Sequence, residues 1–214
     1  MVGFITFEGG DGTGKSTQIR LLEAYLTEHG KNCVTTREPG GTWLGELLRP
    51  VLLQPGNRNI SSPTELFLYL ADRSQHVHEV ISPAIARGQI VLCDRYTDST
   101  LAYQGYGRGI DLQLLVRLNE IATGALKPDI TFLLDCPVEI GLLRIAERQA
   151  SVPEHRGKDR FENEKVQFHE KVRQGFLDLA RAEPERFCVI GASGSAQEAF
   201  AAVKNVVDHR FGIK

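Results

Sequence analysis

The sequence predicts an α/β fold in which a five-stranded parallel sheet is covered by helices on both faces. Three observations support this prediction. Short apolar runs alternate along the chain with longer, helix-patterned stretches. The first apolar run leads directly into a glycine-rich motif and then into an amphipathic helix. The chain has 214 residues and no Pro- or Ser-rich linker, so we expect a single domain over residues 1–214.

The predicted strands are the five runs rich in β-branched and aromatic residues, namely GFITFEG, NCVTTRE, QIVLCD, DITFLLD and RFCVIG. The stretches between and after them have the apolar spacing of helices. They cover approximately residues 15–29, 43–53, 63–87, 111–124, 137–150, 160–182 and 195–209. Because strands joined through helical crossovers run parallel, the sheet is expected to be parallel and buried on both faces.

The charge and hydropathy of the chain exclude several classes of protein. A formal net charge of -2 gives no basic surface for a nucleic-acid partner. No stretch is long enough to span a membrane, and the first apolar run is too short for a signal peptide, so a cytoplasmic protein is expected. The four cysteines form no C-x-x-C pair, which favours reduced, packed thiols over a zinc site.

The segment FITFEGGDGTGKST, residues 4–17, contains a complete phosphate-binding loop of the form G-x-x-x-x-G-K-S. Its glycines allow the backbone N–H groups to turn toward phosphate oxygens at the positive end of the next helix. Lys15 is expected to reach the β- and γ-phosphates of a nucleoside triphosphate, and Ser16 to ligate Mg²⁺. The expected nucleotide-binding residues are Gly9, Gly10, Asp11, Gly12, Thr13, Gly14, Lys15, Ser16 and Thr17.

Asp11 is an unusual residue for such a loop, because phosphates repel a carboxylate. We expect its side chain to point away from the phosphates and to accept a hydrogen bond from a sugar hydroxyl or an arginine. A solvent-exposed loop aspartate is the alternative.

A second site is predicted where the run IVLCDRY ends, because ligands of open α/β sheets collect at the carboxyl ends of the strands. Asp94 is a candidate for the Mg²⁺ site, and Arg95 offers a planar fork to a phosphate. An ordinary salt bridge at the strand end remains an alternative. Tyr69 and Arg73 are four residues apart on a predicted helix and suit a stacked base with an exocyclic oxygen. Taken alone, however, Tyr69 fits a core position as well.

The segment STLAYQGYGRGID is expected to form a short helix over the same cleft. Hydroxyl and amide groups of Thr100, Tyr103 and Gln104 are suited to contact base edges and to crowd a ribose position.

The polar segment at about residues 148–160 is predicted to be a mobile lid. It carries Arg148, Arg156 and Arg160, with Arg144 one helical turn before Arg148. Arginines that close over a transferring phosphoryl group neutralise its charge. The alternative is a solvated basic loop.

Six segments together resemble the thymidylate kinase family, whose members use ATP to phosphorylate dTMP to dTDP. They are FEGGDGTGKST, TREPGGT, LYLADRSQHV, DRYTDSTLAYQGYGRGID, PDITFLLDCPVEIGLLR and DRFENE. The resemblance covers most of the chain. It implies the P-loop nucleoside monophosphate kinase fold, ATP as co-substrate, Mg²⁺, a place in dTTP synthesis, and a homodimer formed through helices beside the cleft.

The resemblance also implies a role for each matched position. Asp11 would lie near the sugar and phosphate of dTMP, and Arg95 would bind that phosphate. Tyr69 would stack on thymine, and Arg73 would reach the base or phosphate. The remaining implied contacts are Thr100 and Gln104 against the base, Tyr103 beneath the deoxyribose, and Arg37, Glu38 and Pro39 along the substrate-lining segment.

Two departures from the family pattern bear on the chemistry. Many members have Phe where this chain has Tyr69, and some carry an arginine where this chain has Gly12. The chain therefore resembles the bacterial type, in which lid arginines supply the charge, here Arg156 and next Arg148. RGKDRFE is one residue shorter than the usual family spacing.

The expected catalytic residues are Asp11, Lys15, Arg95, Arg156 and Arg148. The alternatives are another nucleoside monophosphate or deoxynucleoside kinase, and an inert nucleotide-binding scaffold.

Overall fold

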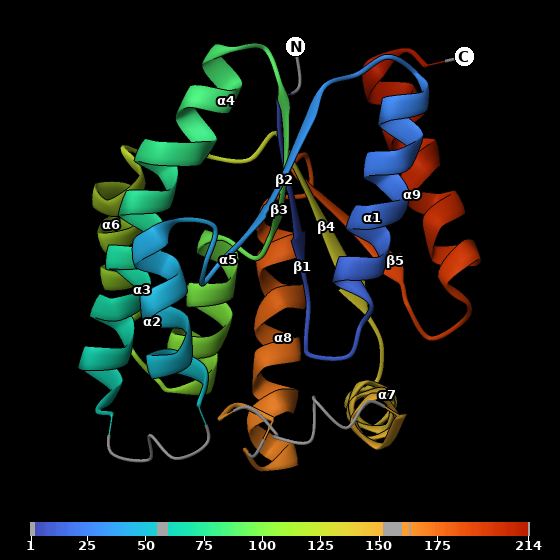
Figure 1. Ribbon diagram of the computed structural model, residues 1–214. Helices are drawn as coiled ribbons and strands as arrows, with labels where there is room; N and C mark the ends of the chain where they lie inside the picture. Colours follow the sequence, from blue (N-terminus) through green and yellow to red (C-terminus); the bar gives the residue numbers. More distant parts are fainter. Residues whose placement is uncertain (1–2, 55–59, 152–159, 163, 214) are drawn as a thin grey trace.

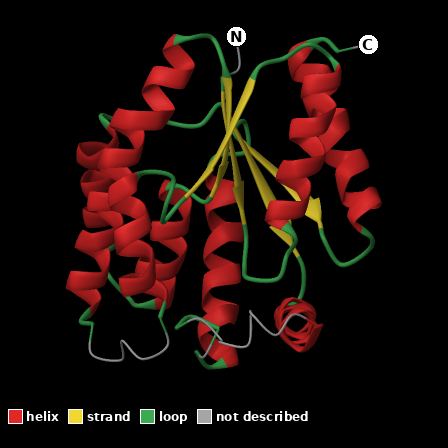
Figure 2. Cartoon of the chain, in the orientation of Figure 1, coloured by secondary structure: helices red, strands yellow, loops and turns green. Residues whose placement is uncertain are grey.

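The computed structural model describes residues 3–54, 60–151, 160–162 and 164–213. Its sheet has five parallel strands in the order β2-β3-β1-β4-β5, which are labelled in Figure 1. Figure 2 shows the sheet in yellow between the helices in red. The strands are β1 (Phe4–Glu8), β2 (Cys33–Arg37), β3 (Ile90–Asp94), β4 (Ile130–Asp135) and β5 (Phe187–Gly191). The predicted α/β fold with a five-stranded parallel sheet is therefore confirmed.

Helices cover both faces of the sheet. One face packs against α1 (Lys15–Glu28) and α9 (Ala196–Phe211). The other packs against α8 (Val166–Ala182) and a π-helical turn, η1 (Val77–Ile81), with α4 (Ser82–Ala86). The remaining elements are α2 (Trp43–Leu53), α3 (Ser62–His76), α5 (Thr97–Thr100), the π-helical η2 (Leu101–Gly107), α6 (Leu112–Thr123) and α7 (Val138–Ser151). Among the described residues, no helix is long and apolar enough to cross a membrane.

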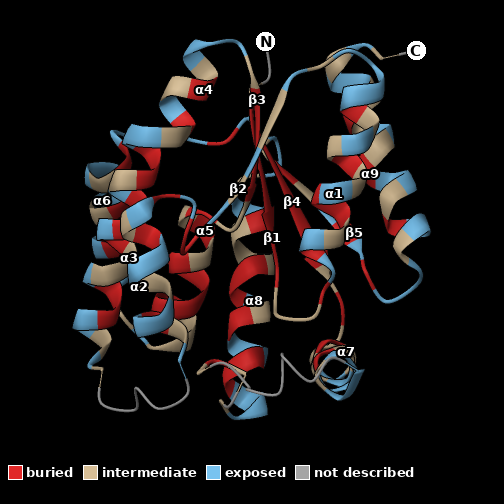
Figure 3. Ribbon diagram, in the orientation of Figure 1, coloured by how far each residue is buried: buried red, intermediate tan, exposed pale blue. Residues whose placement is uncertain are grey.

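The central strand β1 is fully buried because its side chains alternate between two hydrophobic layers (Figure 3). Ile5 and Phe7 pack in the layer beneath α1 and α9. Phe4 packs in the opposite layer, edge-on against Tyr96 at a ring-centroid distance of 4.9 Å. Packing on both faces holds β1 in one position in the sheet. It therefore also fixes the position at which the phosphate loop begins.

The chain departs from the predicted helices in two places. The expected helix over 63–87 is interrupted by η1, directly before Ser82 and Pro83. Pro83 has no N–H to donate, and a wide π turn accommodates the missing bond. The helix expected over 160–182 begins only at Val166. The backbone N–H of Arg160 instead donates to the carbonyl of Leu53, at 2.8 Å.

The loops after β1 and β3 lie side by side because these strands are neighbours in the sheet. The first is the phosphate loop and the second carries Arg95. Both leave the carboxyl edge of the sheet, and Figure 1 shows α7 end-on below that edge. The candidate site is built at this edge.

Candidate active site

The phosphate loop turns sharply between β1 and α1. Gly12 and Gly14 have positive φ angles of 74° and 94°, which side chains disfavour. The Lys15 ammonium folds back over the loop, and its Nζ donates to the carbonyl oxygens of Gly10 at 2.8 Å and Gly9 at 3.2 Å. Burial and the neighbouring Arg95 lower the pKa of Lys15 to about 8. The loop and the helix it opens present N–H groups and a lysine, which is the chemistry of a phosphate site.

Ser16 and Asp94 meet at the start of α1 and the end of β3. The Ser16 hydroxyl donates to Oδ2 of Asp94 at 2.8 Å. A hydroxyl and a carboxylate oxygen beside a phosphate loop fit the oxygen donors that Mg²⁺ prefers, with phosphates and water completing the shell. Binding of Mg²⁺ at this pair stays a prediction.

Arg95 joins the phosphate loop to the second half of the site. Its φ of 71° places it in the left-handed region, where a residue with a side chain is strained. Its Nη1 donates to the carbonyl of Gly9 at 3.0 Å, and its Nη2 donates to Oδ1 of Asp11 at 2.6 Å and to the Tyr103 hydroxyl at 3.1 Å. The guanidinium also lies 5.0 Å from the centre of the Tyr103 ring. The strained backbone thus aims into the site a guanidinium whose Nη1 and Nη2 are held by bonds, which include one to the Ser99 hydroxyl at 3.1 Å.

Asp11 accepts hydrogen bonds from both of these partners. Its Oδ1 bonds Arg95, and its Oδ2 accepts from the Tyr103 hydroxyl at 3.1 Å. Burial opposes the charge of Asp11, but Arg95, Lys15 and the Tyr103 bond hold its pKa below the usual value. This is the arginine pairing expected for Asp11; its contact with a sugar stays a prediction.

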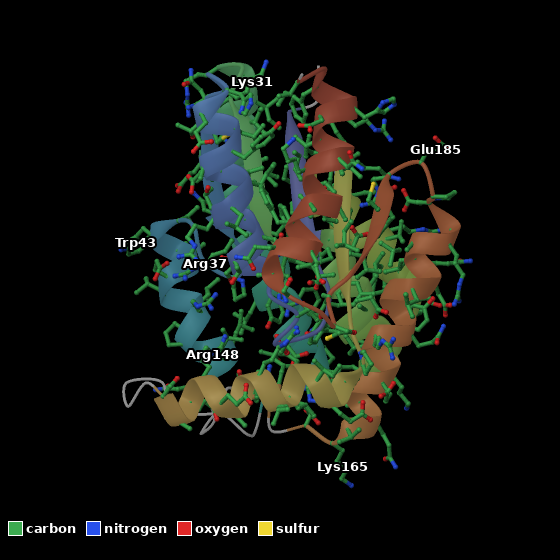
Figure 4. All side chains as sticks on the ribbon, turned by 90° about the vertical axis from the view of Figure 1, so that its right-hand side faces the viewer. Lys31, Arg37, Trp43, Arg148, Lys165 and Glu185 are labelled. Atoms are coloured by element: carbon green, nitrogen blue, oxygen red, sulfur yellow. The ribbon has the colours of Figure 1, made fainter. Side chains whose placement is uncertain are left out.

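A cavity of about 420 Å³ connects the phosphate loop with the segments that follow β2 and β3. The predicted site residues that line it are Asp11, Gly12, Gly14, Lys15, Ser16, Thr17, Arg37, Glu38, Pro39, Tyr69, Arg73, Asp94, Arg95, Thr100, Tyr103, Gln104 and Arg148. Figure 4 labels Arg37 at the end of β2 and Arg148 on α7, which enter the cavity wall from different elements. Gly9, Gly10 and Thr13 instead line a cavity of about 30 Å³ behind the loop.

Tyr69 and Arg73 both line the cavity from α3, one helical turn apart, although Arg73 is only 1% exposed. The Arg73 guanidinium is held by four bonds, to Oε2 of Glu38 (2.7 Å), Oγ1 of Thr100 (2.7 Å), Oδ1 of Asn119 (2.7 Å) and the carbonyl of Tyr96 (2.9 Å). These bonds use four of the five N–H donors of an arginine. Arg73 therefore lines the cavity and also holds together the segments that form its wall.

Of the arginines in and beside the predicted lid, Arg144 and Arg148 line the cavity and Arg160 does not. Arg148 lines the cavity and has a side chain 58% exposed, with Nη2 3.5 Å from Oε1 of Glu162. Arg160 does not line the cavity; it donates to buried Glu65 and to the carbonyl of Leu52. Arg144 donates to the backbone carbonyls of residues 192–194. Arg156 lies outside the described residues, so its place in the site stays a prediction.

A family model described as thymidylate kinase matches residues 7–203 of the chain. The chain belongs to the thymidylate kinase family. The thymidylate kinase of Desulfosudis oleivorans is 53% identical over 209 residues, which cover 96% of this chain and 98% of that protein. The thymidylate kinase of Geobacter sulfurreducens is 51% identical over 207 residues, or 97% of each chain. The crystal structure of thymidylate kinase from Ehrlichia chaffeensis aligns with a TM-score of 0.77 at 36% identity, covering 96% of this chain and 98% of that one. The prediction of an enzyme of this family is confirmed.

A close glycine contact leaves no room for an arginine inside the phosphate loop of this thymidylate kinase family member. A Cβ atom at Gly12 would lie 2.1 Å from the carbonyl oxygen of Gly141 on α7. Conversely, a Cβ atom at Gly141 would lie 2.5 Å from the carbonyl oxygen of Asp11. The two backbones touch, and neither position has room for a side chain.

Several residues of this family member's site escaped sequence reasoning. The cavity is also lined by Arg49, Leu53, Ser99, Phe161 and Glu162. Glu8 does not line it, but its carboxylate accepts from the Tyr96 backbone N–H at 2.7 Å and from the Ser99 hydroxyl at 2.6 Å. Burial and the nearby Asp98 raise the pKa of Glu8 to about 7. The signal available in the sequence was the position of Glu8, a charged residue at the end of the buried strand β1. Such a position indicates that its carboxylate bonds the neighbouring loop.

Proposed function

We propose that the chain transfers the γ-phosphoryl group of ATP to the phosphate of dTMP, giving dTDP and ADP, as a step in dTTP synthesis. The observation that carries this proposal is a cavity with two halves that Arg95 joins. One half is the phosphate loop. The other, called the acceptor half, is lined by Tyr69, Tyr103 and Gln104. The acceptor oxygen is already anionic, so direct in-line transfer needs positioning and charge neutralisation rather than a covalent enzyme intermediate.

Positive groups on three elements would share the charge of the transferring phosphoryl group. Lys15 follows the phosphate loop, Arg95 follows β3, and Arg148 extends from α7. Arg156 is proposed as the principal lid arginine. Mg²⁺, held by Ser16 and Asp94, would neutralise phosphate charge when bound. A lid over about residues 148–160 would exclude water, which otherwise competes as acceptor.

The acceptor half of the cavity suits a deoxynucleotide. Tyr69, which lines the cavity from α3, would stack on the base, and Tyr103, which bonds Asp11 and Arg95, would lie under the sugar. Thr100 and Gln104 come from the α5–η2 segment to face the base together with Arg73. Arg37, Glu38 and Pro39 complete the wall after β2.

We further propose a cytoplasmic homodimer of single-domain subunits. Helix α3 packs between α2 and α6, and these neighbouring helices carry large exposed apolar side chains. Trp43, Leu47 and Phe67 are 77%, 52% and 60% exposed on α2 and α3, and Ile121 is 79% exposed on α6. Figure 4 shows Trp43 at the outer edge of the molecule. Apolar side chains concentrated on adjacent helices favour burial against a second copy.

An ADP-release assay with ATP and Mg²⁺ tests the proposed reaction. The acceptors compared are dTMP, dUMP, dCMP, thymidine and none. Rapid release that requires dTMP and is slow with dCMP is the expected result. Preference for another acceptor would assign the chain to a different nucleotide kinase activity, and release independent of acceptor would indicate ATP hydrolysis. No release with any acceptor would favour an inert scaffold.

A further inference from the structure

We infer that Glu65 is a specificity-determining residue, which acts by fixing the orientation of the Gln104 side-chain amide in the acceptor half of the cavity. The inference deepens the proposed function and rests on it. Gln104 lies on η2, lines the cavity and is 2% exposed. Glu65 lies on α3 and is 1% exposed. The Nε2 atom of Gln104 donates to Oε1 of Glu65 at 2.9 Å.

A glutamine amide has two branches of nearly equal shape, and its hydrogen-bond partners decide which branch faces which way. An ionised carboxylate only accepts hydrogen bonds, so the branch that faces Glu65 has to be the NH₂ group. The opposite orientation would place two oxygens against each other away from water, which is unfavourable.

Two arginines contact the carboxylate of Glu65. The Nε atom of Arg108 lies 3.5 Å from Oε1, and Arg160 donates to Oε2. A guanidinium group has only donors, so Glu65 faces Arg108 and Arg160 as an acceptor at both of its oxygens. Glu65 likewise accepts from Nε2 of Gln104, and the amide oxygen of Gln104 is the branch turned away from Glu65.

This orientation gives the base-facing wall a defined polarity. Gln104 presents an acceptor through Oε1, while Arg73 on the same wall has only donors. Thymine and uracil carry an N3–H donor beside the O4 acceptor, and cytosine carries an N3 acceptor beside an amino donor. The wall matches the first pattern and opposes the second at both positions, so it rejects a cytosine base as well as binding thymine.

The variant Glu65→Gln tests this inference because it keeps the shape of the side chain but replaces a carboxylate, which only accepts hydrogen bonds, with an amide that can also donate them. A glutamine at position 65 can face Gln104 with either its oxygen or its NH₂ group, so the side-chain amide of Gln104 can flip by 180°. We expect the ratio of kcat/KM for dTMP to that for dCMP to fall by about tenfold or more, with the KM for ATP unchanged. Glu65→Asp keeps the charge for Arg108 and Arg160 but withdraws the carboxylate from Gln104, and is expected to lower the ratio as well.

Glu164→Gln is the matched control. Glu164 accepts from Arg108 at 2.6 Å, so this change removes a charge partner of the same arginine and leaves the Gln104 bond in place. The control is expected to keep the parent ratio. A folded Glu65 variant with the parent ratio, or with equal losses on dTMP and dCMP, would overturn the inference and indicate a structural role. A parent chain that phosphorylates no nucleoside monophosphate would instead contradict the proposed function, so the two failures are distinguishable.

Discussion

Arg95 is the residue at which the two halves of the site meet, because it contacts both the phosphate loop and Tyr103. We expect Arg95→Ala to lower kcat by about 10³-fold, since an arginine at a transferring phosphoryl group contributes on that order. ATP binding should persist within about threefold, because Lys15 and the loop backbone hold the triphosphate. Steady-state turnover with dTMP and calorimetric titration with ATP measure the two effects.

The control for this change is Arg181→Ala, which removes an arginine whose side chain is 68% exposed on α8. Its turnover should match the parent. Near-normal turnover in Arg95→Ala would contradict the role assigned to Arg95 in the proposed function.

Asp72 is a buried carboxyl group whose titration affects stability. It accepts from the backbone N–H of Gly40 at 3.1 Å and faces Glu38, His76 and Arg73. Burial, with the charge of Glu38, raises the pKa of Asp72 to about 7. Between about pH 4 and pH 7 the folded chain holds a proton at Asp72 that the unfolded chain has released, so the free energy of unfolding falls as the pH rises.

Asp72→Asn should remove this part of the pH dependence, since the amide does not titrate. Relative to the parent, the free energy of unfolding of the variant should rise by up to about 4 kcal/mol from pH 4 to pH 8, at about 1.4 kcal/mol per pKa unit. Urea denaturation across this range measures it. Glu185→Gln, at an exposed carboxylate, should keep the parent slope. An Asp72→Asn curve parallel to that of the parent would show that Asp72 is ionised throughout.

At the scale of elements, α7 rests on the phosphate loop through the contact of Gly141 with Asp11 and Gly12. Alanine usually stabilises a helix interior relative to glycine by about 1 kcal/mol. Here the added methyl would push α7 and Arg148 away from the loop. A displacement of about 1 Å at a reaction centre lowers rates on the order of 10²-fold, so we expect such a loss of kcat in Gly141→Ala.

The KM for dTMP should stay within about threefold in Gly141→Ala, because the proposed acceptor residues come from other elements. Leu143→Ala is the control, since Leu143 lies on the same helix and is 59% exposed. Parent-like kcat in folded Gly141→Ala would show that the loop tolerates a shift of α7.

The elements that the sequence predicted well are those defined by local pattern. The strands were predictable from apolar runs. The phosphate loop was predictable from a contiguous motif whose glycines are required by the backbone turn itself. The helix over 63–87 was too long because periodicity continues through a π turn. The helix predicted from residue 160 begins at Val166, and the backbone of Arg160 instead makes a long-range bond to Leu53 that a local pattern does not reveal.

The site was predictable where a side chain belongs to a contiguous motif. Glu65 was missed because an acidic residue in the first turn of a helix is ordinary there. Its importance arises only when η2 brings Gln104 against it. Arg160 likewise could not be separated from the lid arginines, since its partner Glu65 lies 95 residues away in the chain.

At the scale of the whole molecule, the apolar surface of α2, α3 and α6 predicts self-association. Phe67→Asp places a charge on α3 at a position that is 60% exposed in one copy. We expect this change to convert a dimer to a monomer in sedimentation velocity, because burying an unpaired carboxylate at an interface is costly. Leu143→Asp alters a similarly exposed leucine on α7 and should leave the dimer intact. A parent that sediments as a monomer would contradict the proposed assembly.

The contact between Gly12 and Gly141 also restricts where this chain can carry a catalytic arginine. A single change of Gly12 to arginine would introduce a Cβ atom 2.1 Å from a backbone oxygen before the new guanidinium could contribute to the reaction. Helix α7 would have to be displaced first, and this displacement would move Arg148 away from the loop. In this chain, charge delivered from α7 and charge delivered from within the loop therefore exclude each other unless the helix moves.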